Sequence, residues 1–349
     1  MKLGTKITSP RVIQLAAAGL VSACWLSPVM AADTSAVAVD SAESMARENW
    51  RAAMAHNVAA PEGCSHASYP SLVWEAVECK VAHPLFHPVF HKPDKGTAQV
   101  VGNGNDYVVS VSGLITETLG TFPTVSDVTT EKSVGVAAFG DGGILGSNEY
   151  TLQANTNYTG TTAACAGHSG CTVWQQFIYS TDYNTKGEAA VFMQYWLIDW
   201  GTKACPSGFG SDGDGDCYGN SNYVAAPDVK ITSLGSLSLS GTVVAGGNDT
   251  VVFNSGTEAY SITGKDSVLD ISSVWTQTEF NVVGDAGGSR ADFNKGASIT
   301  VKVAVKDGST AAPKCVADEG STGETNNLTL GSCTTASGST PYIEFIEKD

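Results

Sequence analysis

Alternation of apolar and polar residues dominates the chain from Tyr107 to its end. Segments rich in β-branched and aromatic residues are separated by Gly, Asn, Asp or Pro, which is the pattern of short strands joined by turns. Such strands, with almost no helical period between them, predict an all-β protein built as a two-sheet sandwich. We expect strands at 107–115, 173–179, 189–198, 229–239, 250–253, 259–262, 273–283, 298–305 and 342–346, with 307–340 as a surface excursion.

The N-terminal part has a different pattern. Within the segment 32–60, residues 33–57 are Ala-rich and have helical spacing, so we expect a short helix capped by Asp40 or Ser41 and running through Met54. Pro61 ends this segment. It is either a helix packed on the body or a leader that is removed as a propeptide, and the sequence leaves both open.

The first 31 residues carry the features of a secretory signal peptide. Three basic residues precede an apolar run at 12–23, and a cleavage position of small residues ends at Ala31. A lipobox-like segment before Cys24 is the alternative, which would anchor the chain by a lipid. The apolar run is too short to span a bilayer and no later run is longer, so we expect a secreted protein, extracellular or periplasmic, without membrane insertion.

Residues 61–349 are expected to form one β-sandwich domain. It begins with a Pro-rich lead-in at 61–100 and contains an inserted cysteine loop at 205–217. Histidines at 83, 87 and 91 would share one side of a helix and could bind a metal, but the prolines between them favour an extended loop.

The chain has nine cysteines, and the eight that follow Cys24 occur as neighbours along the chain. Local disulfides are the simplest hypothesis for an oxidising compartment, although eight cysteines allow 105 pairings. No CxxC motif is present, so we expect no metal site at the cysteines. The expected disulfides are Cys64–Cys79, Cys165–Cys171, Cys205–Cys217 and Cys315–Cys333.

The charge balance narrows the possible partners. The chain has 19 Lys and Arg against 35 Asp and Glu, giving a formal net charge of −16. Such an acidic chain is not expected to bind nucleic acid or an anionic membrane surface. Only 15% of the residues are charged, and this composition would suit an acidic environment in which carboxylates lose charge.

Several familiar catalytic motifs are absent from the sequence. It contains no GxSxG, HExxH or P-loop motif, and its histidines are not placed beside a nucleophile on an expected strand. The acidic segment Asp212-Gly-Asp214-Gly-Asp216 resembles the start of a calcium loop. Cys217 at the sixth position and Tyr223 at the twelfth do not fit that loop, so a solvated acidic turn is the other interpretation.

Polar residues within expected core strands are the strongest candidates for chemistry. A period of two places Trp275, Gln277 and Glu279 on one face of a strand, and Phe280 and Val282 on the other. If the second face packs into the sandwich, Glu279 lies beside Trp275 in a groove suited to general acid or base work. The alternative is an ordinary outward-facing Glu.

Four segments, in the same order along the chain, resemble the glutamic peptidases (eqolisins). They are Leu152-Gln153-Ala154, Trp174-Gln175-Gln176-Phe177, 120–125 and Thr278-Glu279-Phe280-Asn281-Val282-Val283. The resemblance implies a concanavalin A-like sandwich of the jelly-roll type and a secreted endopeptidase active at acidic pH. It also implies catalytic roles for Gln153 and Glu279, with no metal or cofactor.

The chain departs from that family in two ways. Gln176 stands where the family has a carboxylate, and Gln153 and Glu279 are far enough apart to require an insertion, for which 205–217 is the candidate. A broader pattern over 102–305 is similar to uncharacterised secreted bacterial and fungal proteins. Its shared segments are 102–107, 174–177, 194–197, 205–206 and 279–282.

Two functions are therefore expected from the sequence. In the first, Glu279 and Gln153 cleave a polypeptide substrate in a groove. In the second, the same sandwich is a non-catalytic binding module for a glycan or cell-wall polymer, since Trp faces stack on sugars. In both, the protein is a monomer, and the groove is lined by Trp174, Gln176, Gln194 and Trp275.

Overall fold

The computed structural model describes residues 32–56, 62–82, 106–135, 144–158, 160–201, 204–213, 215–285, 289–317 and 325–349. The signal segment, the three histidines at 83–91, and Asp214 lie outside the described residues. The chain divides into two compact units, 1–44 and 45–349. Helix α1 (Ala32–Ala55) crosses that boundary and begins before the expected cap at Asp40 or Ser41.

Two large antiparallel sheets form a sandwich, as the alternation predicted. Among the described residues, sheet I has nine strands, with three-residue β2 and eight-residue β21 at its edges. Its spatial order is β2 (Glu75–Val77), β1 (Cys64–Ser68), β15 (Glu258–Lys265), β14 (Asn248–Ser255), β13 (Leu237–Thr242), β4 (Glu117–Ser126), β18 (Ser298–Lys306), β22 (Tyr342–Lys348) and β21 (Thr329–Ala336).

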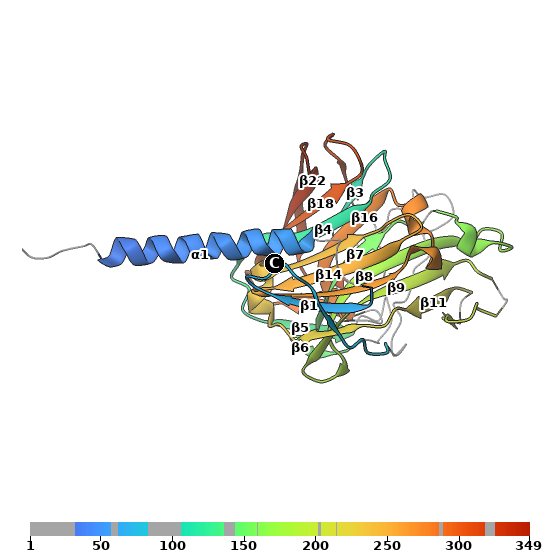
Figure 1. Cartoon of the computed structure of the whole chain (residues 1–349), viewed down its shortest axis with the longest axis horizontal. Helices are drawn as coiled ribbons and strands as arrows, with labels where there is room; N and C mark the ends of the chain where they lie inside the picture. Colours follow the sequence, from blue (N-terminus) through green and yellow to red (C-terminus); the bar gives the residue numbers. More distant parts are fainter. Residues whose placement is uncertain are drawn as a thin grey trace, which may run out of the picture. The chain divides into compact units, whose positions relative to one another are not determined.

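Sheet II forms the second layer, and its central strands β9, β8, β7 and β16 lie side by side (Figure 1). The spatial order is β10 (Gly210–Ser211), β11 (Cys217–Asn220), β9 (Glu188–Ile198), β8 (Thr172–Thr185), β7 (Tyr150–Thr156), β16 (Gln277–Gly284), β3 (Tyr107–Ser110) and β19 (Lys314–Ala317), with β12 (Val224–Pro227) also paired to β9.

A small third sheet and four short 3₁₀ helices complete the described elements. The sheet consists of β20 (Thr325–Asn326), β17 (Ser289–Phe293), β5 (Glu131–Gly135) and β6 (Gly146–Ser147). The 3₁₀ helices are η1 (Ala163–Cys165), η2 (Ile231–Ser236), η3 (Asp266–Val268) and η4 (Ile271–Ser273).

Two expected segments differ from the structure. The expected strand 229–239 is mostly η2, and only its last residues belong to β13; apolar alternation in a short run does not separate a 3₁₀ turn from a strand. The expected excursion 307–340 contains β19, β20 and β21. Their side chains are partly exposed, so they lack the apolar alternation that marks a buried strand.

The core lies between sheets I and II, and glycines in sheet I allow aromatic rings to pack closely on its backbone. A Cβ at Gly120 on β4 would lie 2.0 Å from the Phe280 ring of β16. One at Gly241 on β13 would lie 2.4 Å from the Phe177 ring of β8. Phe280 and Phe177 therefore point from sheet II toward sheet I. The neighbours of each, one residue along the strand, point to the opposite, outer face of sheet II.

The second half of α1, from Met45 to Ala55, packs on the outer face of sheet I. Trp50 is 4% exposed and Met54 is fully buried, in contact with a cluster that includes Val252 of β14 and Ala259 of β15. The Trp50 indole donates to the Ser71 carbonyl at 2.6 Å. This part of the helix therefore lies on the opposite side of the sandwich from the outer face of sheet II.

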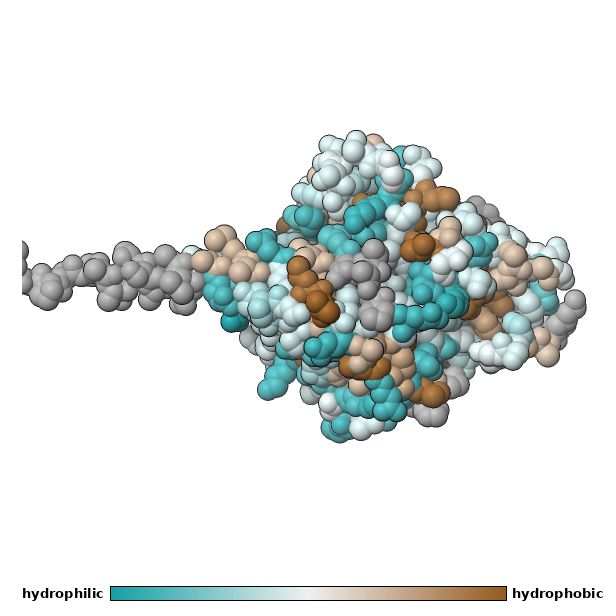
Figure 2. Space-filling model, in the orientation of Figure 1, coloured by the Kyte–Doolittle hydropathy of each residue, from teal (hydrophilic) through white to brown (hydrophobic). Residues whose placement is uncertain are grey.

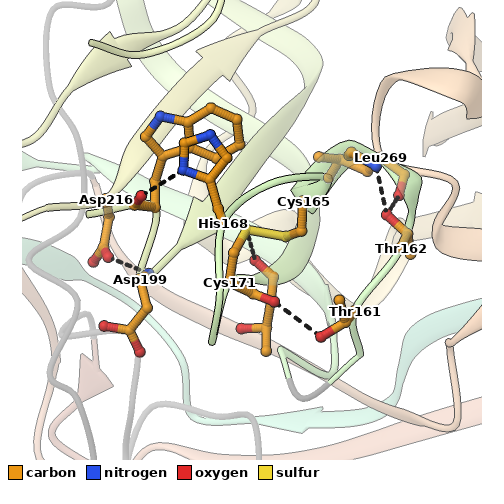
Figure 3. The surroundings of a disulfide bond; sticks show 11 residues. Thr161, Thr162, Cys165, His168, Cys171, Asp199, Asp216 and Leu269 are labelled. Carbon is orange, nitrogen blue, oxygen red and sulfur yellow. Dashed lines mark hydrogen bonds between the residues drawn. A yellow bond between two sulfur atoms is a disulfide. The ribbon is translucent and has the colours of Figure 1, made fainter. Parts of the chain in front are cut away.

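All four predicted disulfides are present in the described part of the chain. Figure 3 shows Cys165–Cys171, which closes a short loop carrying His168. The His168 ring stacks on Trp200 with centroids 3.3 Å apart, and its Nδ1 lies 2.8 Å from the Trp200 carbonyl. Disulfides of this kind are typical of proteins made for an oxidising compartment.

The surface carries apolar side chains in separate patches. On the face shown in Figure 2, brown apolar areas are interrupted by teal polar ones. Val73 at 69% and Val81 at 66% are among the most exposed large apolar side chains. None of the helices in the described part of the chain combines the length and apolar character that crossing a bilayer requires.

Candidate functional site

The candidate site lies on the outer face of sheet II. Because Phe280 and Phe177 point into the sandwich, Glu279 and Gln176 point outward. On β7, Leu152 and Ala154 belong to the main core, so Gln153 also points outward. The sequence predicted that Gln153 and Glu279 share one face. Both side chains lie on the outer face of sheet II.

Strand register aligns polar side chains into a row across five strands. Asn155 pairs with Glu279 of β16 on one side and Gln176 of β8 on the other. Gln176 pairs with Gln194 of β9, and Gln194 pairs with Asn220 of β11. Side chains that are directly opposite in adjacent strands lie within contact distance. The polar row, defined by these five residues, runs perpendicular to the strands.

Asn155 joins the two candidate catalytic residues. Its Nδ2 donates to Glu279 Oε1 at 2.5 Å and lies 3.5 Å from Gln153 Oε1. Gln153 Nε2 in turn donates to Thr151 Oγ1 at 3.1 Å. Glu279 and Gln153 thus share one donor, and the amide of Asn155 fixes their separation.

A second set of hydrogen bonds extends from Gln153 along the polar row. Gln176 Nε2 donates to Gln153 Oε1 at 3.1 Å. The Trp196 indole donates to Gln194 Oε1 at 2.8 Å and approaches Gln176 Oε1 at 3.3 Å. Gln194 Nε2 donates to Asn220 Oδ1 at 2.9 Å. The amides are consequently held in defined orientations rather than free to rotate.

Aromatic side chains lie beside the polar row, two residues away from it along β8, β9 and β11. The rings of Trp174 and Trp196 lie 5.8 Å apart, and that of Tyr218 lies 5.3 Å from Trp196. These three side chains form a cluster separate from the sandwich core, together with Val108 and Tyr158. The face therefore combines neutral amides, one carboxylate and large apolar rings.

Four of the five predicted partners of Glu279 share its face, and Trp275 does not. Trp275 is fully buried in the sandwich core, where its ring lies 5.8 Å from Phe177. The prediction that it lines the groove is wrong because β16 starts only at Gln277. The chain before β16 follows η4, so the period of two does not extend back to residue 275.

Burial also distinguishes the two interpretations of Glu279. Glu279 is 1% exposed and Gln153 is 5% exposed, and Gln176 and Trp174 are fully buried. An ordinary solvent-exposed Glu is therefore wrong for this position. A buried carboxylate is stabilised by donated hydrogen bonds such as the one from Asn155.

Sequence reasoning missed Asn155 and Asn220 as members of this site. Asn155 follows Gln153 by two residues, so strand alternation alone places both on one face and could have found it. Asn220 ends the short strand β11, just after the expected loop insertion at 205–217. Its position is set by pairing with Gln194, which the sequence does not reveal.

A separate group of carboxylates lies at the opposite end of β7 and β8. Burial, and then repulsion from Asp285 and Glu149, raises the pKa of Glu131 to about 9. Burial and a hydrogen bond to Asp182 raise the pKa of Glu149 to about 7. The same two causes raise the pKa of Asp228 to about 6. The raised pKa values keep these three carboxyls protonated in acid.

The described ranges contain no group of three or more His, Cys, Asp and Glu side chains arranged to hold a metal ion. The acidic segment proposed as a calcium loop is described only in part. Asp212 Oδ1 there accepts from the Asp216 amide at 3.0 Å, and Asp216 Oδ1 accepts from the Asp199 amide at 2.7 Å. Both carboxylates thus order the turn of the cysteine loop (Figure 3 shows the second bond).

Comparison with known proteins found similarity to solved structures. No protein-family model matches the chain, and no curated protein matches it. The chain is similar to scytalido-glutamic peptidase bound to a peptide-based transition-state analog, at 12% identity and a TM-score of 0.28. It is also similar to SCP-B, a member of the Eqolisin family of peptidases, in a complex with the tripeptide Ala-Ile-His, at 10% identity and a TM-score of 0.27. Each match covers 70% of this chain and 98% of the other.

Proposed function

We propose that this chain is a secreted peptide hydrolase of the glutamic type, working at acidic pH through Glu279 and Gln153. The observation that carries the proposal is their position on one face of adjacent strands, joined through Asn155. A carboxylate and an amide held together in this way supply a base and a hydrogen-bond donor. Hydrolysis of an amide bond needs both.

In the proposed reaction, Glu279 acts first as a base. Its carboxylate takes one proton from a water molecule while the water oxygen attacks the carbonyl carbon of the peptide bond. The same carboxyl then returns the proton to the amine as the carbon–nitrogen bond breaks. One water is consumed, the products are a carboxylic acid and an amine, and no cofactor is needed.

Gln153 stabilises the charge that develops during attack. Its Nε2 donates to Thr151 in the resting arrangement, and in the reaction it would donate to the oxyanion instead. Its Oε1 accepts from Gln176 at 3.1 Å, which orients the amide with its nitrogen available. A donor of this kind is typically worth about 3 kcal/mol of transition-state stabilisation.

Two further parts of the proposal concern the ends of the chain. We propose that residues 1–31 direct export and that 32–60 form a leader before the sandwich domain at 61–349. Four disulfides support an oxidising destination. The helix segment 45–55 packs on sheet I, so a cut that releases it removes no residue of the polar row.

The test is a digest of denatured protein by the purified chain between pH 2 and 7. Because the polar row is buried, samples are compared with and without prior incubation at pH 3. We expect cleavage in acid by the wild type and its loss in Glu279→Gln. Glu344→Gln, at a partly exposed position of β22, is the control for the charge change. A wild type that cleaves nothing under any of these conditions contradicts the proposal.

The binding-module alternative is favoured by one observation, the combination of neutral amides with the Trp174–Trp196 pair. Amides donate to and accept from hydroxyl groups, and Trp faces stack on sugar rings, which would require the buried faces of Trp174 and Trp196 to open. In that case, a glycan array probed with the inactive Glu279→Gln chain would give binding, and the digest would give no products. Cleavage that disappears in Glu279→Gln contradicts this alternative.

A further inference from the structure

Asn155 lies at the centre of the site and has an acceptor that the structure leaves unused. The side chain is 1% exposed, and its Nδ2 makes the bonds to Glu279 and Gln153. Its Oδ1 is buried without a hydrogen-bond partner among the described residues. Buried side-chain acceptors are nearly always satisfied, so one left open beside a carboxylate suggests a donor that arrives with the reaction.

The orientation of the Asn155 amide follows from its neighbours. An ionised Glu279 carboxylate can only accept hydrogen bonds, and so can Gln153 Oε1, so both must face the nitrogen of Asn155. The oxygen then occupies the other end of the planar amide group. Reversing the amide would place two acceptors together at 2.5 Å, where a donor is required.

An unused acceptor does not by itself make a site, and Asn254 shows why. Asn254, on β14, is also fully buried, donates to a single side chain and has an unpaired Oδ1. Its one partner is Ser238 Oγ at 3.1 Å, and no carboxylate accepts from its amide in the described structure. What distinguishes Asn155 is that its donor holds Glu279 while its acceptor stays available.

We propose that Asn155 is a third catalytic residue of the proposed reaction, holding Glu279 with its amide nitrogen and the attacking water with its amide oxygen. The inference rests on the proposed function. The water would donate one O–H to Glu279, which receives that proton, and the other O–H to Asn155 Oδ1, which keeps it as a hydrogen bond. The water oxygen is thereby aimed at the carbonyl carbon, and bound geometry of this kind accelerates attack.

The test compares Asn155→Ala, Asn155→Ser and Asn254→Ala in steady-state peptide hydrolysis at acidic pH. Asn155→Ala should lower kcat about 100-fold with KM changed less than about threefold, since the bond to water matters in the transition state. Asn155→Ser keeps both a donor and an acceptor, so it should recover part of that loss. Asn254→Ala removes an equally buried amide and should keep kcat within about threefold of the wild type.

Asn155→Asp supplies a readout of direct contact with the reacting carboxyl. Two adjacent carboxyls titrate as a coupled pair, with one pKa lowered and the other raised, so the pH–rate profile should move from its wild-type position, whereas Asn254→Asp should leave it unmoved. Asn155→Ala with the same kcat as Asn254→Ala, while Glu279→Gln is inactive, would overturn the role of Asn155 and leave the proposed function intact. An inactive wild type would overturn both.

Discussion

Glu131 provides the sharpest prediction about stability, because the fold holds this carboxyl where its charged form is unfavourable. It lies on β5 and is 2% exposed. Burial, followed by repulsion from Asp285 and Glu149, raises its pKa from 4.5 to about 9. A group whose pKa is higher in the folded state contributes its stability in acid and loses it as pH rises toward the folded value.

The size of the effect follows from the two pKa values. Below pH 4.5 the carboxyl is protonated in both states and has no effect on their balance. At pH 7 the unfolded chain has released the proton and the folded chain has kept it. This pH lies about 2.5 units above the unfolded pKa of 4.5. At about 1.4 kcal/mol per unit, this lowers the free energy of unfolding by about 3 kcal/mol between pH 4 and pH 7.

Glu131→Gln removes this loss because a neutral amide replaces the protonated acid. We expect urea denaturation at pH 4 to give similar free energies of unfolding for the variant and the wild type. At pH 7 the variant should be more stable by about 3 kcal/mol. Glu344→Gln, which changes the formal charge equally at a partly exposed site, is the control. If wild type and Glu131→Gln lose the same stability between pH 4 and 7, the reasoning about Glu131 is wrong.

Two substitutions test the packing that positions the site. Gly120→Ala places a Cβ 2.0 Å from the Phe280 ring and should destabilise the fold by about 1–3 kcal/mol, seen as a lower Tm; an unchanged Tm would contradict the close approach of β4 and β16. Trp50→Ala removes a side chain that is 4% exposed and should cost about 3–5 kcal/mol. Unchanged melting of that variant would show that the helix segment is dispensable to the folded body.

Acid stability should extend beyond Glu131. Burial also raises the pKa of Asp249 and of Glu347 to about 8 each. Asp249 accepts from Gln175 inside the sandwich, and Glu347 accepts from Asn281 and Asn326. Each carboxyl disfavours the folded state as pH rises above its unfolded pKa, and this cost is absent in acid, where both states are protonated.

Much of the fold was predictable because its causes are local. Alternation along β8 and β9 determines which residues face the core, and the register of these strands sets Gln176 beside Gln194. Cysteines close in sequence form the four disulfides because short loops close at a low entropic cost. The expected strand at 229–239 was wrong because a short apolar run also fits a buried 3₁₀ turn such as η2.

The sequence by itself determined that Gln153 and Glu279 lie on strands, with Phe280 on the opposite face from Glu279, because side-chain direction depends only on the local backbone. Only the tertiary structure decided that β7 pairs with β16 in the register that sets Asn155 opposite Glu279. These residues are more than a hundred positions apart, so no local pattern encodes their pairing. Trp275 shows the same limit, since η4 breaks the alternation and the chain directs that ring into the core.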